Sequence, residues 1–428
     1  MRITGAAFHS SDTSMTKGFD WAARQAAAYV EEDKPVGPCY AASLPGRNAF
    51  CVRDASHQAL GAHVLGADAC NRNIFRRFAE AISESKGFCS WWEITFDGTP
   101  CPADYKDDED FWYNLPANFD LMDACWRMFN WTADLGYLQD TCMEYFHQVS
   151  VTDYVRHWDR DNDGIPDRRH SDGRRGIAGY DESPRNSGYL TAADLLGAEY
   201  AAFYARGKML ALKGERKNSE RMAARSAELR RIYEEAWWNG AEGRFCEVGY
   251  ANGFGGEYTG VNAFLPLYYN MVSDYDKLNK QLAYVIKNDA LHNEEERSYM
   301  PEILWRYGAD EAAQRIWLAM TSPGYNRREY PEVSFAALGA VAAGYMGVCP
   351  DAAESALVTR SAVPDGGFAE INYLPLWGGV IHLRHESKQA SVLENLTGRA
   401  LKWTARFDSG VSKTLDVPAG HTARLRKD

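Results

Sequence analysis

The chain has 428 residues, of which 45% are hydrophobic and 25% are charged. These proportions are typical of a folded globular protein and exclude a disordered chain. The sequence holds 47 Lys and Arg residues against 59 Asp and Glu residues, a formal net charge of −12. Such an acidic balance argues against nucleic acid or an anionic membrane surface as the main partner.

Targeting and redox features are sparse. No stretch approaches the roughly 18 apolar residues that a membrane helix needs, and the N-terminal stretch lacks the apolar core of a signal peptide. The nine cysteines are scattered without a C-x-x-C pair, so neither a zinc ribbon nor a disulfide framework is predicted. We therefore expect a cytoplasmic protein.

Helical periodicity covers most of residues 15–347. Met122, Cys125 and Phe129, for example, fall on one face of the segment 118–134, as expected for a helix with one buried stripe. The expected helices occupy residues 16–30, 53–66, 73–83, 118–134, 141–158, 189–214, 220–238, 259–272, 276–288, 300–308, 310–320 and 333–347. This makes about twelve helices, within the accuracy of such assignments.

An even-numbered array of helices either stacks as a solenoid or closes into a ring. A solenoid should show a repeat of fixed period, and this sequence has none. We therefore predict an all-α fold over residues 1–361: a closed double ring of helices, an (α/α)6 barrel, with its long loops at one mouth. Residues 362–428 alternate short β-branched runs with turn signals, which predicts a small C-terminal β appendage.

An acidic loop, "DRDNDGIPD", places Asp159, Asp161 and Asp163 at alternate positions before Gly164. This pattern is the first half of a calcium loop. The twelfth position, which should hold a bidentate glutamate, is His170. A structural calcium ion is one interpretation of the loop, and a solvated acidic turn is the other.

A second polar segment, "GYDESPR", carries Asp181 and Glu182 just before an expected helix. One of these carboxylates can cap that helix, which needs no chemistry. Alternatively, one is a general acid at the mouth of the barrel, because glycoside hydrolysis uses one carboxyl group to protonate the leaving oxygen and another to activate water. That chemistry requires no cofactor.

These two segments, followed by "LTAADLL", resemble the catalytic domains of six-hairpin glycosidases, such as processing α-glucosidase and mannosylglycerate hydrolase. The resemblance implies the (α/α)6 fold, an inverting mechanism and a general acid at Asp181. The segment "AFCVRDASHQAL" resembles a stretch of the glucoamylase-type domains in which an Arg-Asp pair grips hydroxyls of the terminal sugar. The matching pair here is Arg53 and Asp54, whose other interpretation is a helix cap.

The segment "REYPEVSFAALGAVAAGYMG" resembles the final hairpin of the same glycosidases, where a glutamate before the last long helix acts as the base. The matching candidates are Glu329 and Glu332, and we favour Glu332 because it lies nearest the helix start. Glu302, in "RSYMPEILWRYG", is a third candidate at the mouth end of another helix.

Further substrate contacts are expected from aromatic and basic residues. The chain has 13 Trp, 24 Tyr and 18 Phe, and aromatic faces are surfaces on which sugar rings pack. Trp92 is a candidate stacking platform, and His57 is a candidate mouth-lining residue beside Arg53 and Asp54. The other interpretation of these residues is a large core.

Basic residues crowd the approach to Asp181, namely Arg168, Arg169, His170, Arg174, Arg175 and Arg185. Such a cluster can pair with a sugar carboxylate, which predicts a uronic-acid substrate contact for Arg185. It can equally balance the acidic loop just before it.

Three functions follow. The first is an exo-acting glycoside hydrolase on short oligosaccharides, with Asp181 as acid and Glu332 as base. The second is a polysaccharide lyase or sugar epimerase on the same barrel, with His57 or a tyrosine as base. The third is a non-catalytic carbohydrate-binding protein. The sequence predicts no oligomeric state.

Overall fold

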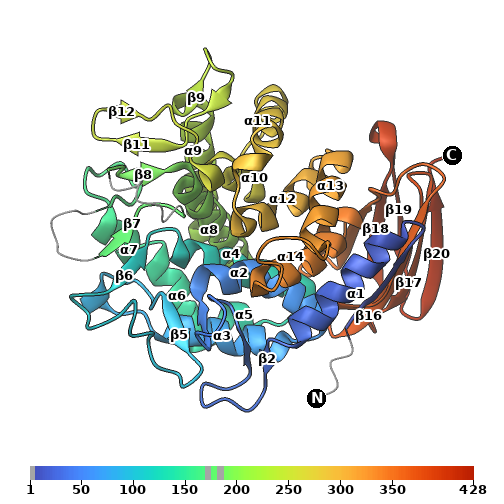
Figure 1. The fold of residues 1–428 in the computed structure, drawn as a ribbon, viewed down its shortest axis with the longest axis horizontal. Coiled ribbons are helices and arrows are strands. Elements are labelled where there is room, and N and C mark those ends of the chain that lie inside the picture. Colours follow the sequence, from blue (N-terminus) through green and yellow to red (C-terminus); the bar gives the residue numbers. More distant parts are fainter. Residues whose placement is uncertain (1–4, 169–174, 181–187) are drawn as a thin grey trace.

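The structure is a computed structural model that describes residues 5–168, 175–180 and 188–428. About 46% of the residues are helical and 21% lie in strands, so the all-α expectation understates the β content. Helices occupy most of the chain up to Tyr345, and two larger sheets follow (Figure 1).

Local sequence signals begin several of the helices. Asp12 and Asp274 accept backbone N–H groups at the starts of α1 and α11, and Pro331 opens α14. The longer helices are α1 (Thr13–Ala27), α2 (Val52–Leu65), α3 (Asp68–Glu80), α4 (Ala117–Thr132), α6 (Thr141–Ser150), α8 (Ala193–Leu212), α9 (Arg216–Ala236), α11 (Tyr275–Lys287), α12 (Glu294–Arg306), α13 (Asp310–Thr321) and α14 (Pro331–Ala340). The shorter ones are α5 (Gly136–Gln139), α7 (Asp153–Trp158), α10 (Leu265–Tyr268), the π-helix η5 (Val341–Tyr345), and the 3-10 turns η1 (Glu84–Lys86), η3 (Gly260–Ala263), η4 (Asp289–Leu291) and η6 (Asp408–Gly410).

Six helices contact one another in a cycle. α2, α4, α8, α10, α12 and α14 are in contact in that order, and α14 also contacts α2. Every residue of α2 and of α14 is buried, which is typical of helices covered on all sides. The two helices approach closely at Gly61, where an added Cβ would lie 2.0 Å from the carbonyl oxygen of Phe335.

The C-terminal region forms two sheets, one of which includes a strand from the N-terminal end. The first sheet contains β1 (Ala7–Ser10), β15 (Phe368–Leu376), β16 (Gly379–Glu386), β17 (Ala390–Leu396) and β20 (His421–Arg426). The second contains β13 (Cys349–Asp351), β14 (Ala356–Arg360), β18 (Leu401–Arg406) and β19 (Ser412–Val417). β1 pairs antiparallel with β15, with Phe8 opposite Ile371. The strands thus begin at Cys349, before the expected division at 361/362, while that division into domains stays a prediction.

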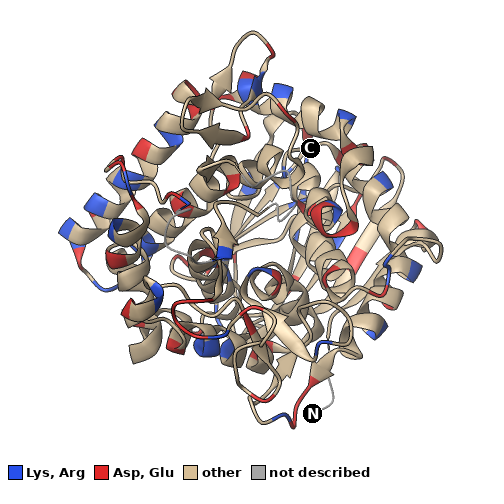
Figure 2. Ribbon diagram, turned by 60° about the vertical axis from the view of Figure 1, so that its left-hand side comes forward, with Lys and Arg blue, Asp and Glu red and all other residues tan. Residues whose placement is uncertain are grey.

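Short strands also lie between the helices. They are β2 (Val30–Glu31), β3 (Cys39–Tyr40), β4 (Ala49–Cys51), β5 (Glu93–Thr95), β6 (Trp112–Asn114), β7 (Arg175–Ile177), β8 (Thr191–Ala192), β9 (Trp238–Asn239), β10 (Arg244–Phe245), β11 (Val248–Tyr250) and β12 (Gly253–Phe254). Figure 1 shows β5 to β8, β11 and β12 on the side of the body away from the C-terminal sheets. Charged residues of both signs alternate around the outer helices (Figure 2). None of the helices in the described ranges has the length and apolar character that a bilayer crossing requires.

Candidate active site

Three carboxylates come together from the first turns of three helices. Asp54 lies at the start of α2, Glu295 at the start of α12 and Glu332 at the start of α14. A helix N-terminus carries a partial positive charge that stabilises such groups. Because α14 contacts both α2 and α12, one carboxylate oxygen of each residue lies within 4.8 Å of the other two. We refer to Asp54, Glu295 and Glu332 as the carboxylate cluster.

Glu332 is the most deeply buried member of the cluster, with a side chain that is 0% exposed. Burial raises the pKa of Glu332 well above its ordinary value, and repulsion from Asp54 and Glu295 raises it further, while Arg53 and Arg327 oppose the shift. A buried carboxyl group with like charges beside it favours its neutral form. The surroundings of Glu332 therefore favour its protonated form.

His57 is the hydrogen-bonding partner of Glu332. Its Nδ1 lies 2.6 Å from Glu332 Oε1, and its ring stacks on that of Tyr299 with centroids 3.4 Å apart. Burial, with Arg127 and Arg53 nearby, lowers the pKa of His57 well below its ordinary value. The shifts favour the neutral form of each group, and the two side chains share one short hydrogen bond.

A cavity of about 460 Å³ opens in front of the cluster, a size that small-molecule sites commonly have. Asp54 and Glu295 line it, whereas Glu332 is buried behind them. The aromatic residues of its wall are Trp92, Trp112, Tyr180 and Tyr330. Carboxylates accept hydrogen bonds from sugar hydroxyls, and aromatic faces pack against sugar rings. The cavity wall offers both features.

Arg53 contacts several residues of the cavity wall at once. Its Nη1 donates to the carbonyl oxygen of Tyr180 at 3.1 Å, and its Nη2 donates to Glu295 Oε1 at 3.5 Å. The guanidinium carbon lies 3.5 Å from the ring centroid of Tyr180 and 5.0 Å from that of Trp92. A planar guanidinium is suited to this combination of stacking and hydrogen bonding, so Arg53 fixes the relative positions of three parts of the wall.

The structure brings most of the sequence-predicted residues together. Arg53, Asp54 and Trp92 line the cavity, Glu332 belongs to the carboxylate cluster, and His57 is hydrogen-bonded to Glu332. These five residues come from segments separated by up to about 280 positions, which supports their assignment to one site.

Two predicted residues, Asp181 and Arg185, lie outside the described residues. Tyr180, which directly precedes Asp181, is 5% exposed and lines the cavity. The chain therefore reaches the cavity wall immediately before the predicted general acid.

Glu302 is not among the described residues that line the cavity. It follows Glu295 by seven positions on α12, which is two helical turns, and it pairs with Arg127 at 2.8 Å and with Arg306. The expectation placed it at the mouth end of this helix, but the glutamates of α12 that line the cavity are Glu295 and Glu296. Glu329, the other sequence candidate for the base, is exposed to solvent.

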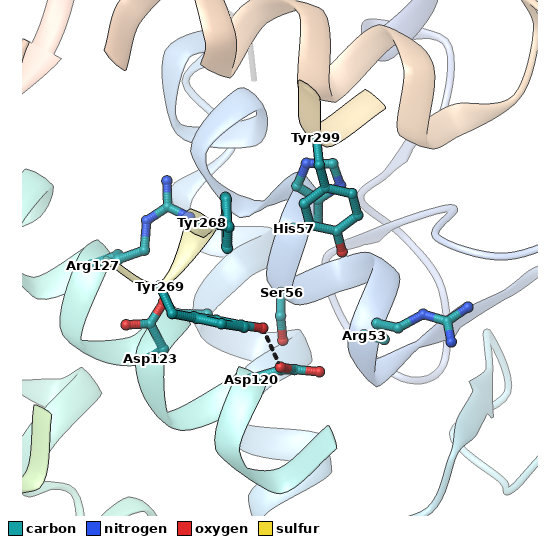
Figure 3. A pocket seen from close by; sticks show the side chains of 10 residues that line it. Arg53, Ser56, His57, Asp120, Asp123, Arg127, Tyr268, Tyr269 and Tyr299 are labelled. Atoms are coloured by element: carbon teal, nitrogen blue, oxygen red, sulfur yellow. Dashed lines mark hydrogen bonds between the residues drawn. The ribbon is translucent and has the colours of Figure 1, made fainter. Parts of the chain in front are cut away.

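A second hollow, of about 10 Å³, lies among residues of α2, α4, α12 and the end of α10 (Figure 3). It has room for about one water molecule. Tyr269 donates a hydrogen bond to Asp120 there (Figure 3), and burial raises the pKa of Asp120 to about 7. This hollow is too small for a sugar, and we assign it to the polar support beneath Arg53 and His57.

Sequence reasoning missed Glu295 and Tyr330. Tyr330 donates from its hydroxyl to Glu295 Oε1 at 3.3 Å. Glu295 stands within three successive glutamates that follow Asn293, and Asn293 with Glu296 forms a capping box. That pattern is typical of an ordinary helix start. The only signal for a functional role was that Glu295 lies between the two residues of the capping box without belonging to it.

The acidic loop after α7 gathers a slightly different set of carboxylates from the one predicted. Asp159, Asp161 and Asp167 each place one oxygen within 4.8 Å of the others, while Asp163 accepts from the backbone N–H of Ile165 at 2.7 Å. Burial and the neighbouring acids raise the pKa of Asp167 to about 6. Oxygen-rich loops of this kind can hold Ca²⁺, and calcium here stays a proposal.

No protein-family model matches the sequence, and no curated protein matches it significantly. Solved structures share its fold. A GH78 family rhamnosidase of Bacillus sp. GL1 superposes with a TM-score of 0.60 at 13% identity, over 95% of this chain and 43% of that one. An α-L-rhamnosidase from Dictyoglumus thermophilum gives 0.63 at 12% identity, over 98% and 50%. A glycosidase variant in complex with glucose gives 0.55 at 14% identity, over 78% and 98%.

The chain thus spans about half the length of the two rhamnosidases or less. At these identities the similarity shows the fold. The resemblance to six-hairpin glycosidases inferred from the motifs is confirmed at that level.

Proposed function

We propose that this chain is a glycoside hydrolase built on an (α/α)6 barrel. The cycle of contacts from α2 through α14 and back to α2 supports an inner ring of helices. The structures that share the fold include two rhamnosidases and a glycosidase. The observation that carries the proposal is the carboxylate cluster at the wall of an aromatic-lined cavity of about 460 Å³.

The reaction needs one carboxyl group as acid and one carboxylate as base. We assign the acid to Asp181, and the position of Tyr180 in the cavity wall supports this assignment. The Asp181 proton passes to the glycosidic oxygen as the bond from that oxygen to the anomeric carbon breaks. The water oxygen bonds to the anomeric carbon from the opposite face, and the base takes the proton that this water loses. The anomeric configuration is inverted, and no cofactor is required.

Glu295 is the member of the cluster best placed to act as base. Its side chain is 20% exposed and lines the cavity, so it can contact the attacking water. Glu332, the base predicted from the sequence, is fully buried, and burial with the neighbouring acids raises its pKa well above the ordinary value. It is the alternative, because it lies within 4.8 Å of Glu295 and the two carboxyl groups can exchange a proton.

The cavity supports an exo-acting enzyme on short oligosaccharides. Its volume accommodates the end of a sugar chain and not a long polymer. Asp54, with Arg53 held behind it, offers acceptor oxygens for the hydroxyls of the terminal sugar.

The charges of the cavity favour a neutral sugar over a uronic acid. Among the described lining residues, the guanidinium groups belong to Arg47 and Arg53. Each already faces a carboxylate: Arg47 lies 2.7 Å from Glu93, and Arg53 lies 3.5 Å from Glu295. Arg175, from the predicted basic cluster, pairs at 2.9 Å with an exposed acid outside the cavity.

Geometry also ranks the other two functions. A lyase or epimerase that uses His57 as base needs its imidazole at the substrate, but His57 is hydrogen-bonded to Glu332 and stacked under Tyr299. A carbohydrate-binding protein without activity has no need of three carboxyl groups held together against their mutual repulsion. Hydrolysis is the function that uses the cluster.

The test is product analysis in H₂¹⁸O with a panel of aryl glycosides of neutral hexoses, 6-deoxyhexoses and hexuronic acids. We expect the wild type to release a reducing sugar that carries one ¹⁸O at the anomeric carbon. Asp181→Asn should lower kcat by several orders of magnitude and leave KM nearly unchanged, because the acid acts in the transition state. An unsaturated product, or full activity of Asp181→Asn on a phenyl glycoside, would overturn the proposal.

A further inference from the structure

We infer that Asp194 is a positioning residue of this site: it holds Tyr180 and, through it, the start of the chain that carries the proposed acid. The inference rests on the proposed function. Asp194 lies in the first turn of α8, is 1% exposed, and is not among the described residues that line the cavity. It therefore acts through other residues and not on the sugar.

Asp194 connects two separate parts of the chain. Its Oδ1 accepts from the backbone N–H of Leu195 at 2.7 Å, within its own helix. Its Oδ2 accepts from the backbone N–H of Tyr180, fourteen positions away. A residue that only capped α8 would need the first bond and not the second.

Tyr180 is held on its other sides as well. Arg53 donates to its carbonyl oxygen at 3.1 Å and stacks on its ring at 3.5 Å. With Asp194 on the N–H and Arg53 on the carbonyl oxygen, both backbone groups of Tyr180 are bonded to buried side chains. Tyr180 is therefore held in the cavity wall through its N–H, its carbonyl oxygen and its ring.

The residue before Tyr180 is fixed in the same way. Asn114, at the end of β6, donates from its side-chain amide to the carbonyl oxygen of Gly179 at 3.1 Å. Gly179 packs so tightly that an added Cβ would lie 2.8 Å from Asp194 Oδ1. The segment is therefore clamped by Asn114, Asp194 and Arg53 together.

Burying a carboxylate is costly, and burial raises the pKa of Asp194 to about 7. Perturbed acids beside a cavity are typical of functional sites. A general acid must meet the glycosidic oxygen at hydrogen-bonding distance, and a misplacement of about 1 Å can cost about 10²-fold in rate. Asp194 supplies one of the bonds that hold Tyr180, the residue directly before the proposed acid.

The experiment compares two glycosides of one sugar that the wild type hydrolyses, a phenyl glycoside and a 2,4-dinitrophenyl glycoside. Dinitrophenolate leaves without a proton, so only the phenyl glycoside depends on the acid. Asp194→Asn keeps the shape but turns an amide toward one of the two N–H donors. We expect kcat on the phenyl glycoside to fall about 10²-fold, and kcat on the dinitrophenyl glycoside to fall less than about tenfold.

Glu199→Gln is the matched control. Glu199 is a fully buried carboxyl group on the same helix that pairs with Arg225 at 3.5 Å and lies away from the described lining of the cavity. This variant should retain wild-type rates on both glycosides. If Asp194→Asn does not fold, as judged by its thermal melt, Asn114→Ala replaces it and should show the same selective loss at smaller size.

Equal losses on both glycosides, or no loss, would overturn the positioning role while leaving the hydrolase intact. A wild type that cleaves neither glycoside would overturn the proposed function, and the positioning role with it. A selective loss on the phenyl glycoside, with the control unaffected, supports the inference.

Discussion

At the scale of residues, the candidate site is a cluster of three acids whose carboxylate oxygens lie within 4.8 Å of one another. Asp54, Glu295 and Glu332 gain their proximity from helix packing, since they are up to about 280 positions apart in the chain. The motifs identified Asp54 and Glu332, and the structure places both in the cluster. Their burial could not be predicted, because which side chain lies at the surface of a cavity is decided by tertiary packing.

Glu302 is the opposite case: the sequence indicated a residue at the cavity, and the structure does not place it there. Its sequence context suggested the mouth of the barrel, but it lies two turns further along α12 than Glu295, where it pairs with Arg127 of α4 and Arg306 of its own helix. The pair with Arg127 joins residues 175 positions apart, and such a pair leaves no local pattern in a sequence. The residue that replaces it at the cavity, Glu295, was indistinguishable from a helix-starting acid.

At the scale of elements, helices were predictable and short strands were not. Apolar spacing of three and four residues marks the stretches that became α4, α8 and α9. Strands of two or three residues, such as β7 and β8, are too short to show an alternating pattern. β1 was missed because its partner, β15, lies more than 350 positions away.

The acidic loop after α7 gives a prediction at this scale. We expect millimolar Ca²⁺ to raise Tm and a chelator to reverse the effect, because a ligand that binds only the folded state stabilises it. Asp161→Asn should remove most of this response, since Asp161 belongs to the group of three carboxylates. Asp276→Asn, at an exposed acid of α11, should leave it unchanged. Identical melts with calcium and with chelator would show that the loop is a solvated turn.

At the scale of the whole molecule, burial of acids makes stability depend on pH. Burial raises the pKa of several carboxyl groups: Glu199 to about 8, and Asp120, Asp194 and Glu247 to about 7. Each binds its proton more tightly in the folded state than in the unfolded state, where its pKa is about 4. The stabilisation from these groups is complete below that value and is lost as pH rises through 7 to 8.

Buried histidines make stability increase with pH, the opposite of the acids, but they do so over a lower range of pH. His147 and His385 have a pKa lowered to about 4, and their contribution stops changing above about pH 6.5, the pKa of the unfolded state. We therefore expect Tm to fall by several degrees between pH 6.5 and pH 8.5, measured by calorimetry. Glu199→Gln should reduce the fall. A Tm that rises over this range would contradict the assigned burial of these acids.

The overall architecture was the most predictable level. The number and spacing of the helices favoured a closed ring, and the cyclic contacts of α2 through α14 agree with it. The C-terminal β texture was predicted correctly in kind, although its sheets include Cys349–Asp351 and the N-terminal strand β1. The helical character follows from apolar periodicity along the chain, whereas the edges of sheets depend on pairings between distant segments.

The central claim is that a carboxylate of the cluster activates water for attack on a sugar in this cavity. Azide rescue of Glu295→Ala and Glu332→Ala tests it most directly, with Glu199→Gln as the control. Removing a base leaves room for azide, which attacks without losing a proton. We expect Glu295→Ala to lose about 10²- to 10⁴-fold in kcat and to form a glycosyl azide of inverted configuration when azide is added. Rescue of Glu332→Ala alone would move the base to the residue predicted from the sequence, and near-wild-type hydrolysis by both variants without azide would contradict the claim.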